Sequence, residues 1–310
     1  MKRAGLVFVL LLLAGCAPAD YGSQQAEAAR PPKSPPGQPS KSETPKPEYL
    51  LAAGDIASCA VQGDEQTAAI LRKEKGTVAP LGDLAYQSGT AEEFANCYDP
   101  SWGTVRNRTR PAVGNHEYAS GNGAAAYFEY FGSQAGEPGK GYYSYDLGPW
   151  HLIALNSNCT VVSCAVGSPQ EQWLRADLAA TEAECVVAYW HHARWSSGPH
   201  GSSTAVAPFW NALYENGADV VLVGHDHDYE RFEPLNSAGE IDQARGIRQF
   251  VVGTGGRSLY RIGTPITGSA ARNDRAYGVL KLTLEPGRYK WDFLAANESP
   301  FKDSGSGTCH

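Results

Sequence analysis

The sequence has little charge, no excess of basic residues and no visible internal repeat. Charged side chains make up 19% of its 310 residues, and 26 Lys and Arg face 33 Asp and Glu, which gives a formal net charge of −7. A nucleic-acid-binding surface needs a basic face, so this composition argues against that class of partner. What the chain does contain is 16 Tyr, nine Phe and seven Trp, which supply large side chains for a folded core.

The amino terminus lacks an apolar run long enough to cross a membrane as a helix. Two basic residues precede only nine apolar residues, 6–14, whereas a transmembrane helix needs about 20. A run of this length suits a secretory signal, and its end resembles the lipobox of bacterial lipoproteins, Leu13-Ala14-Gly15-Cys16. We therefore expect residues 1–15 to be a signal peptide and Cys16 to carry a lipid anchor in the bacterial cell envelope. The alternative is an ordinary signal peptide with an incidental cysteine.

Residues 17–47 have the composition of a tether. They contain eight prolines in 31 positions and a single aromatic residue, Tyr21. Such a segment cannot bury enough apolar surface to fold, so we expect residues 16–47 to be the lipidated cysteine and an extended Pro-rich linker. The folded unit is then expected to be one domain, residues 48–310.

The seven cysteines are odd in number, and assigning Cys16 to the lipid leaves six. In an exported protein, six cysteines are expected to form up to three disulfides. Fifteen pairings of six cysteines are possible, and the sequence does not choose among them. The pairs that we expect are Cys59–Cys97, Cys159–Cys164 and Cys185–Cys309, and the alternative is that some of these cysteines remain free and buried.

Strand-like and helix-like segments alternate through the rest of the chain, which is typical of an α/β fold. Short apolar runs predict strands at 49–53, 78–81, 142–147, 151–156, 185–190, 220–223, 248–252, 279–284 and 289–294. Helical spacing predicts helices at 64–74, 168–178 and 208–215, with Ser168 as an N-cap before Pro169.

Polar residues follow these strands again and again. They are Gly54-Asp55, Gly82-Asp83, Gly114-Asn115-His116-Glu117, His191-His192 and Gly224-His225-Asp226-His227. Ligands of α/β folds collect where strands deliver loops at their carboxyl ends, and six of the eight histidines lie in or just after these loops, at positions 116, 191, 192, 200, 225 and 227. Carboxylates, an amide oxygen and imidazoles are ligands for borderline-to-hard cations, and a bridging carboxylate can hold two ions about 3.5–4 Å apart.

As an ordered set, these five blocks resemble the motifs of the calcineurin-like metallophosphoesterases. Tyr86, three residues after Asp83, and the run Tyr229-Glu230-Arg231 are similar to the purple acid phosphatase branch. The resemblance spans residues 54–231, and it implies a four-layer αββα sandwich of two mixed sheets with a dinuclear metal site at the carboxyl ends of the strands. One departure is Ala57, where the family usually has glycine.

The resemblance also implies which residues bind the two metals. Fe(III) would be bound by Asp55, Asp83, Tyr86 and His227. A second, divalent metal (Fe, Zn or Mn) would be bound by Asp83 as the bridge together with Asn115, His191 and His225. A phenolate makes sense on a trivalent cation, because the cation lowers the pKa of the phenol. The alternative for Tyr86 is an aromatic side chain that packs behind the site.

In the family, the histidine after the asparagine ligand faces the substrate, and this implies a catalytic role for His116. His200 matches a second substrate-facing histidine, and a plain surface histidine is its alternative. His191, at the end of a strand, is expected to be the ligand in preference to His192. Substrate specificity is expected to lie in loops such as 119–126 and 257–272.

The function that we expect is hydrolysis of a small phosphomonoester, in which a metal-bound hydroxide attacks phosphorus in line with the leaving group. A ferric ion favours an acidic pH optimum. One alternative is a phosphodiesterase or nucleotide pyrophosphohydrolase with the same site. Another is an exported metal- or phosphate-binding lipoprotein without turnover. The sequence does not indicate the physiological substrate or the oligomeric state.

Overall fold

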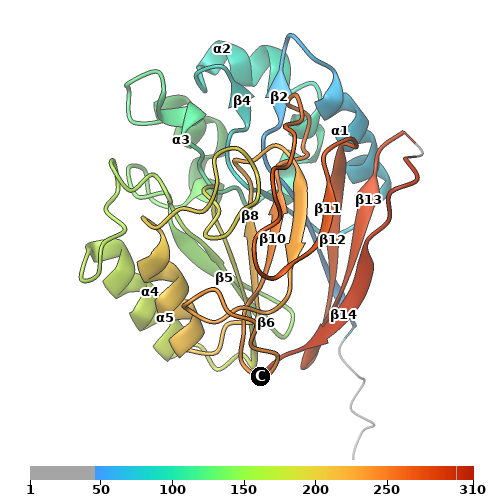
Figure 1. Cartoon of the computed structure of the whole chain (residues 1–310). Coiled ribbons are helices and arrows are strands. Elements are labelled where there is room, and N and C mark those ends of the chain that lie inside the picture. The colour runs from blue at the N-terminus through green and yellow to red at the C-terminus, as the bar shows by residue number, and fades with distance from the viewer. Residues whose placement is uncertain (1–45, 298) are drawn as a thin grey trace, which may run out of the picture. The chain divides into compact units, whose positions relative to one another are not determined.

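The computed structural model describes residues 46–297 and 299–310, in which two mixed β-sheets pack face to face (Figure 1). The smaller sheet has the strand order β14 (Ser304–Thr308), β13 (Arg288–Ala295), β12 (Gly278–Glu285), β1 (Glu48–Ala53) and β3 (Thr77–Pro80). Strand β1 lies next to the edge strand of this sheet and pairs antiparallel with β12 and parallel with β3, so the first strand of the domain depends on one of the last.

The larger sheet has seven strands. Their order is β11 (Ser269–Asn273), β9 (Tyr229–Phe232), β10 (Arg248–Val252), β8 (Val220–Val223), β7 (Cys185–Tyr189), β6 (Trp150–Ala154) and β5 (Tyr143–Leu147). The four central strands, β10, β8, β7 and β6, are parallel, so their carboxyl ends lie at one edge of the sheet. A separate pair, β2 (Ala57–Ser58) and β4 (Ala85–Tyr86), lies beyond the carboxyl end of β1.

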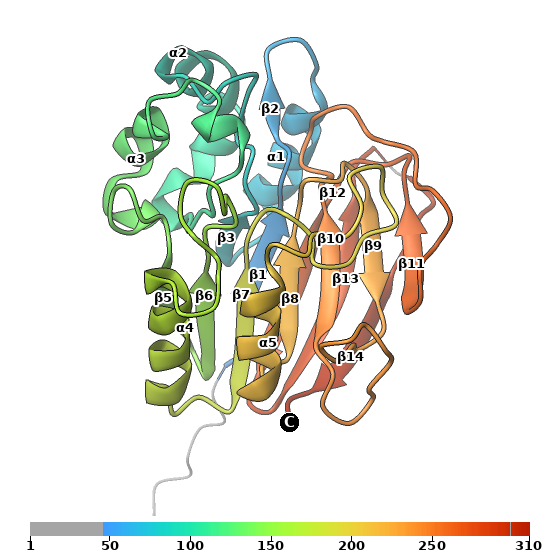
Figure 2. The ribbon, with the colours of Figure 1, turned by 60° about the vertical axis from the view of Figure 1, so that its left-hand side comes forward.

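Alternating side chains of the larger sheet supply two apolar layers. Val187 and Leu222 belong to the core between the sheets, whereas Val186 and Val221 face the other way. That outer face is covered by α4 (Pro169–Ala180) and α5 (Ala207–Glu215), which lie side by side in Figure 2. On the other side, α1 (Gly63–Lys73) packs against β12, which completes the expected α/β sandwich of two mixed sheets with flanking helices.

The remaining helices are short. They are α2 (Ala91–Glu93), the π-helical turn η1 (Phe94–Tyr98), the 3₁₀ segments η2 (Trp102–Arg108), η3 (His116–Tyr118) and η4 (Gly132–Ala135), and α3 (Ala125–Phe131). Several of their aromatic residues join the core between the sheets.

Each predicted strand and helix is found within a few residues of its expected bounds. The N-cap at Ser168 is confirmed, since its hydroxyl accepts a hydrogen bond from the amide of Glu171. The sequence gives no apolar signal for β14, whose residues are Ser-Gly-Ser-Gly-Thr, and it forms because β13 offers a complete row of backbone partners.

All three expected disulfides are confirmed. Cys59 pairs with Cys97, Cys159 with Cys164 and Cys185 with Cys309. The last bridge joins the start of β7 to the carboxyl-terminal segment, and closing so long a loop strongly restricts the unfolded chain. Asp219 lies beside this bridge, but disulfide sulfurs are not thiolates and so are not ligands for a cation.

The predicted signal segment, and all but the last two residues of the predicted tether, lie outside the residues that the structure describes. The division of the chain at residue 47 and the anchor at Cys16 therefore stay predictions. Among residues 46–297 and 299–310, no helix is both long and apolar enough to span a bilayer.

His151 of β6 fastens the β5–β6 hairpin to α4. Its Nδ1 lies 2.8 Å from Oδ1 of Asp146, and its Nε2 lies 2.9 Å from Oδ2 of Asp177. Neutral imidazole has only one N–H, so two carboxylate acceptors favour the protonated ring. Burial alone would lower the pKa of His151, but its hydrogen bonds to Asp177 and Asp146 raise it above its ordinary value.

We therefore expect His151→Gln to lower the free energy of unfolding by about 2 kcal/mol at pH 5.5 and by less at pH 9. Because the pKa is raised in the folded state, this stabilisation is fully present below the unfolded-state pKa of about 6.5. It is lost as the pH rises through the folded-state pKa. Urea unfolding of the wild type and the variant at the two pH values measures the effect. An equal loss of unfolding free energy at both pH values would contradict a protonated His151 between the two carboxylates.

Candidate metal centre

Five strand ends deliver the predicted ligands to one edge of the sandwich. Asp55 follows β1, Asp83 follows β3, and Tyr86 ends β4. From the larger sheet, His191 lies two residues after β7, and the loop after β8 carries both His225 and His227. Asn115, in the loop that precedes η3, completes the predicted set.

Three of these residues have unusual backbone conformations. The φ angles of Asp55, Asp83 and His225 are 59°, 52° and 74°, in the left-handed region that residues other than glycine rarely adopt. Surrounding hydrogen bonds hold this strain in place, including the bond from the amide of His225 to Oδ2 of Asp55 (2.9 Å). The preceding Gly224 allows the close approach, since a Cβ there would lie 2.7 Å from the same oxygen.

The first group of ligand atoms surrounds the hydroxyl of Tyr86. This oxygen lies 2.9 Å from Oδ1 of Asp55, 3.3 Å from Oδ2 of Asp83 and 3.2 Å from Nε2 of His227. The four residues expected to bind one metal therefore point their ligand atoms at one another.

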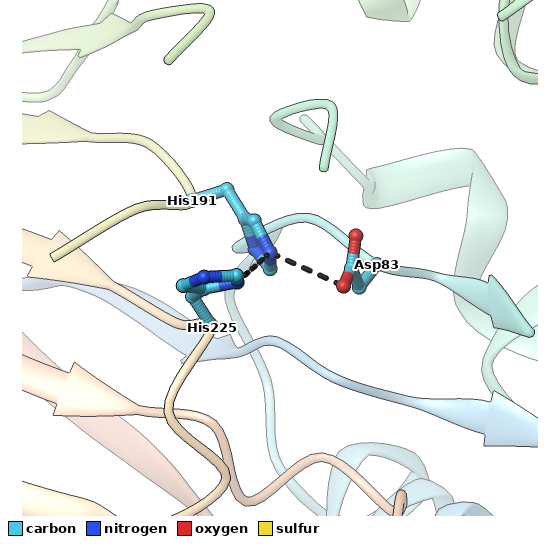
Figure 3. A group of neighbouring side chains, drawn as sticks. All are labelled: Asp83, His191 and His225. Carbon is cyan, nitrogen blue, oxygen red and sulfur yellow. Dashed lines mark hydrogen bonds and ion pairs between the residues drawn. The ribbon is translucent and has the colours of Figure 1, made fainter. Parts of the chain in front are cut away.

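The second group surrounds Nε2 of His191. This nitrogen lies 3.0 Å from Oδ1 of Asn115, 3.1 Å from Nδ1 of His225 and 3.2 Å from Oδ2 of Asp83. Figure 3 shows Asp83, His191 and His225 converging in this way. The same Asp83 oxygen belongs to both groups, which is the place that a bridging carboxylate would occupy.

Backbone carbonyls fix the orientation of two of the histidines. Nδ1 of His191 lies 2.8 Å from the carbonyl of Leu81, and Nδ1 of His227 lies 2.8 Å from that of Ser258. A carbonyl only accepts, so each Nδ1 carries a proton, and each ring in its neutral form presents an Nε2 lone pair to the other ligand atoms. Lone pairs this close repel unless a proton or a cation lies among them, so these nitrogen and oxygen atoms suit a metal ion.

The electrostatics of the second group agree with this reading. Burial alone would lower the pKa of His191, but the adjacent Asp83 carboxylate raises it to about 9. Burial and the charge of His191 together lower the pKa of His225, which leaves its ring neutral. The protein alone thus holds one proton beside Asp83, and a bound cation would take its place.

Tyr86 behaves differently with and without a cation. Burial, and then the carboxylates of Asp55 and Asp83, raise the pKa of its phenol well above the ordinary value. Without a cation, Tyr86 therefore stays protonated and donates its hydrogen bond to Asp55. A highly charged cation between these groups would reverse the balance and favour the phenolate.

Glu117 organises the site without a predicted ligand role. It is fully buried, and its Oε1 accepts the amides of Leu84 (2.7 Å) and Ala85 (3.3 Å). Its Oε2 accepts the amides of Asp83 (3.0 Å) and Gly114 (2.8 Å). Burial and the nearby Asp83 raise the pKa of Glu117 to about 7, while these amides favour the charged form. One side chain therefore ties together the two loops that carry Asp83 and Asn115.

The remaining site histidines lie around the rim. The ring of His116 packs on Tyr86 with a centroid distance of 4.4 Å, and its Nε2 lies 3.7 Å from Oδ2 of Asp83. The exposed ring of His200 stacks on His225 at 4.2 Å. His192 instead directs Nδ1 to the hydroxyl of Ser157 (2.8 Å), so His191 rather than His192 offers a nitrogen to the ligand cluster.

Two buried carboxylates hold the loop that carries His200. Asp226 accepts the amide of His200 (2.8 Å) and the hydroxyl of Ser196. Glu230 accepts the amide and the hydroxyl of Ser197 (2.8 and 2.6 Å). Both carboxylates come from the segment that carries His225 and His227, so this segment carries predicted ligands and also positions the rim. In the sequence, Asp226 and Glu230 stand out only as parts of motifs, because their partners lie about 30 residues away.

Sequence comparisons show which known proteins the chain resembles. The family model described as calcineurin-like phosphoesterase matches residues 39–229. An uncharacterized protein of Mycobacterium tuberculosis is 30% identical over 228 residues, which cover 58% of this chain and 43% of that protein. Purple acid phosphatase 18 of Arabidopsis thaliana is 28% identical over 199 residues, which cover 56% of this chain and 42% of that protein. The chain thus spans less than half the length of these curated relatives.

Two solved structures have a similar fold. A purple acid phosphatase from yellow lupin seeds matches with a TM-score of 0.74 and 18% identity, over 85% of this chain and 54% of that one. GAP50 of Plasmodium, described as the anchor in the inner membrane complex, matches with a TM-score of 0.69 and 16% identity, over 86% and 90%.

We expect Glu117→Gln to weaken metal binding about 10- to 100-fold, because the amide NH₂ would face backbone N–H donors and displace both ligand loops. Metal analysis after dialysis against a weak chelator measures the effect. Asp219→Asn is the matched control, since Asp219 is also buried and accepts backbone amides, from Val186 and His310, but lies at the other end of β7. It should lower stability and keep the metal, and an equal metal loss in both variants would contradict the role of Glu117.

Asp226→Ala should loosen the loop at 195–201. Loss of its two hydrogen bonds is expected to speed amide hydrogen exchange in that loop about 10- to 100-fold, as followed by mass spectrometry. Asp228→Asn is the control, because the buried Asp228 carboxylate has no hydrogen-bond partner among the described residues. If Asp228→Asn speeds exchange as much as Asp226→Ala, the hydrogen bonds of Asp226 are not what holds this loop.

Proposed function

The chain belongs to the calcineurin-like phosphoesterase family, and we propose that it hydrolyses phosphate monoesters at a dinuclear centre of Fe(III) and a divalent ion. The observation that carries the proposal is the hydroxyl of Tyr86, which lies between Asp55 and Asp83 at hydrogen-bonding distance from both. A phenol in that place suits a ferric ion, and the purple acid phosphatases among the relatives support the same reading.

The proposed ligands divide between two ions. The ferric site consists of Asp55, Asp83, Tyr86 and His227, and the divalent site, for Fe, Zn or Mn, consists of Asp83, Asn115, His191 and His225. Bound there, the ions would polarise the phosphate oxygens and lower the pKa of the attacking water. Their positive charge would also offset the buried carboxylates of Asp55 and Asp83.

His116 is placed to donate a proton to the leaving group. Its Nδ1 lies 2.6 Å from the carbonyl of Gln87, and this fixes a proton on Nδ1 and turns Nε2 toward the ligand cluster. A protonated Nε2 can then donate to the leaving oxygen as the bond from phosphorus to that oxygen breaks. His200, whose ring stacks on that of His225, would hold a second phosphate oxygen or the leaving group.

We also propose that the protein is exported and anchored through a lipid on Cys16. The resemblance of residues 13–16 to a lipobox supports this, and so do the three disulfides, which suit an oxidising compartment.

We expect the purified protein to hold two metal ions, one of them iron, and to absorb visible light through charge transfer from the Tyr86 phenolate. Tyr86→Phe should lose the band and at least 10-fold in kcat. Tyr260→Phe is the matched control, because the Tyr260 ring stacks on His227 at 3.9 Å outside the ligand group. A band that survives in Tyr86→Phe, or no iron in active protein, would overturn the ferric assignment.

The reaction class is tested with p-nitrophenyl phosphate and bis(p-nitrophenyl) phosphate. We expect faster hydrolysis of the monoester and an acidic pH optimum. Faster hydrolysis of the diester would favour a phosphodiesterase or nucleotide pyrophosphohydrolase. Binding of phosphate without hydrolysis of either ester would favour the non-catalytic lipoprotein.

A further inference from the structure

A pocket of about 510 Å³ opens beside the metal centre, on the side of Tyr86. Its walls come from the end of β2 and the residues after it, from the segment that runs from the end of β4 into η1, and from Arg257 in the loop after β10. Because the Tyr86 ring is part of the wall, the pocket and the proposed ferric site share a side chain.

The pocket is held in shape by covalent and polar contacts. The Cys59–Cys97 disulfide joins two of its walls. The carboxylate of Glu93 accepts the backbone amides of Gln87, Ser88 (3.0 Å) and Thr90 (2.9 Å), which fixes the turn after β4. A pocket of this kind needs little reordering when a ligand enters.

Arg257 is the cationic group of the pocket. Its guanidinium carbon lies 5.2 Å from the centre of the Tyr86 ring, and its amide donates to the carbonyl of Asp55 (2.8 Å). The backbone bond fixes Arg257 to the loop of a proposed ligand. Its side chain is partly exposed and therefore accessible to a bound molecule.

Arg257 differs from the other arginines that follow it. Arg261 and Arg275 form ion pairs with Asp274, and Arg272 donates to Ser269. Among the described residues, none of the ion pairs or side-chain hydrogen bonds involves the guanidinium of Arg257. Its five N–H donors are thus available to an oxyanion.

The two acidic residues of the pocket, Glu92 and Glu93, do not neutralise Arg257. Glu93 is occupied by the backbone donors of the turn and by the hydroxyl of Thr90 (3.1 Å). Glu92 is an exposed residue of the short helix α2, where water screens its charge. An anion that enters along the face of Tyr86 therefore meets the guanidinium.

The pocket begins where the leaving group would depart. Gln87 lines the pocket, and its carbonyl accepts a hydrogen bond from Nδ1 of His116, the proposed proton donor. A leaving group that takes its proton from His116 therefore lies beside the mouth of the pocket, and the rest of that group can extend toward Arg257.

We propose that this pocket binds the leaving group and that Arg257 binds a second anionic group on it. The preferred substrates would then be phosphate monoesters whose leaving group carries a further phosphate or carboxylate. This inference rests on the proposed function. In the reaction itself, water forms the new bond to phosphorus, the bond to the leaving oxygen breaks, and that oxygen takes the proton. Arg257 takes no part in these bond changes.

The test compares phenyl phosphate with 3-carboxyphenyl phosphate and 3-phosphonophenyl phosphate, which differ only in the second anion. We expect Arg257→Ala to lower kcat/KM about 10- to 100-fold for one or both of the doubly anionic esters, and to change that of phenyl phosphate less than about threefold. The ester with the larger loss identifies the second anion as carboxylate or phosphoryl. Arg261→Ala is the matched control, because it removes the same charge from the same loop outside the pocket, and it should leave all three values within about threefold.

Two results would overturn the proposal. An equal loss on all three esters would mean that Arg257 binds the transferred phosphoryl group, and no loss on any would mean that the pocket does not recognise anions. A binding measurement separates this inference from the proposed hydrolysis. Calorimetry with phenylphosphonate, 3-carboxyphenylphosphonate and 1,3-phenylenediphosphonate should show tighter binding of a doubly anionic ligand, and Arg257→Ala should abolish the difference. That pattern without ester hydrolysis would refute the proposed function and keep the anion site, whereas equal affinities in the wild type would refute the anion site.

Discussion

Electron-rich oxygen and nitrogen atoms of the predicted ligands face one another at the edge of the sandwich. The surrounding structure has to hold these mutually repelling atoms close together. The hydroxyl of Tyr86 and Nε2 of His191 each have three predicted ligand atoms within 3.3 Å. Such an arrangement is stable only when positive charge lies among the atoms and the backbone prevents them from moving apart. The left-handed conformations of Asp55, Asp83 and His225 serve the same purpose, because they occur in the loops at the strand ends where the predicted ligand atoms meet.

Buried carboxylates supply much of this restraint. Glu117 joins two ligand loops through four backbone amides, while Asp226 and Glu230 hold the loop that carries His200. None of the three is among the predicted ligands, yet each lies next to one or within a few residues of one in the chain. The site therefore consists of an inner set of atoms that can bind cations and an outer set that binds peptide N–H groups.

The sequence was informative where a local pattern decides the structure. Apolar runs located the main strands, Ser168-Pro169 located a helix start, and glycine before a polar residue marked the loops at the strand ends. It was uninformative where the partner lies far along the chain. Strand β14 has no apolar side chains and depends on β13, the roles of Glu117 and Asp226 depend on backbone groups of other loops, and Arg257 becomes distinctive only beside Tyr86.

The position of β1 inside the smaller sheet affects the order in which the domain can be completed. This strand is made first and lies between β3 and β12, and β12 is made only after the whole larger sheet. During synthesis one edge of β1 therefore has no strand to pair with, and an open, apolar edge is prone to association with other chains. Asp55 lies two residues after β1, so the proposed ferric site acquires its final geometry late, after distant parts of the chain have met. The need to protect nascent β1 thus follows from pairing the first strand of the described domain with one of its last.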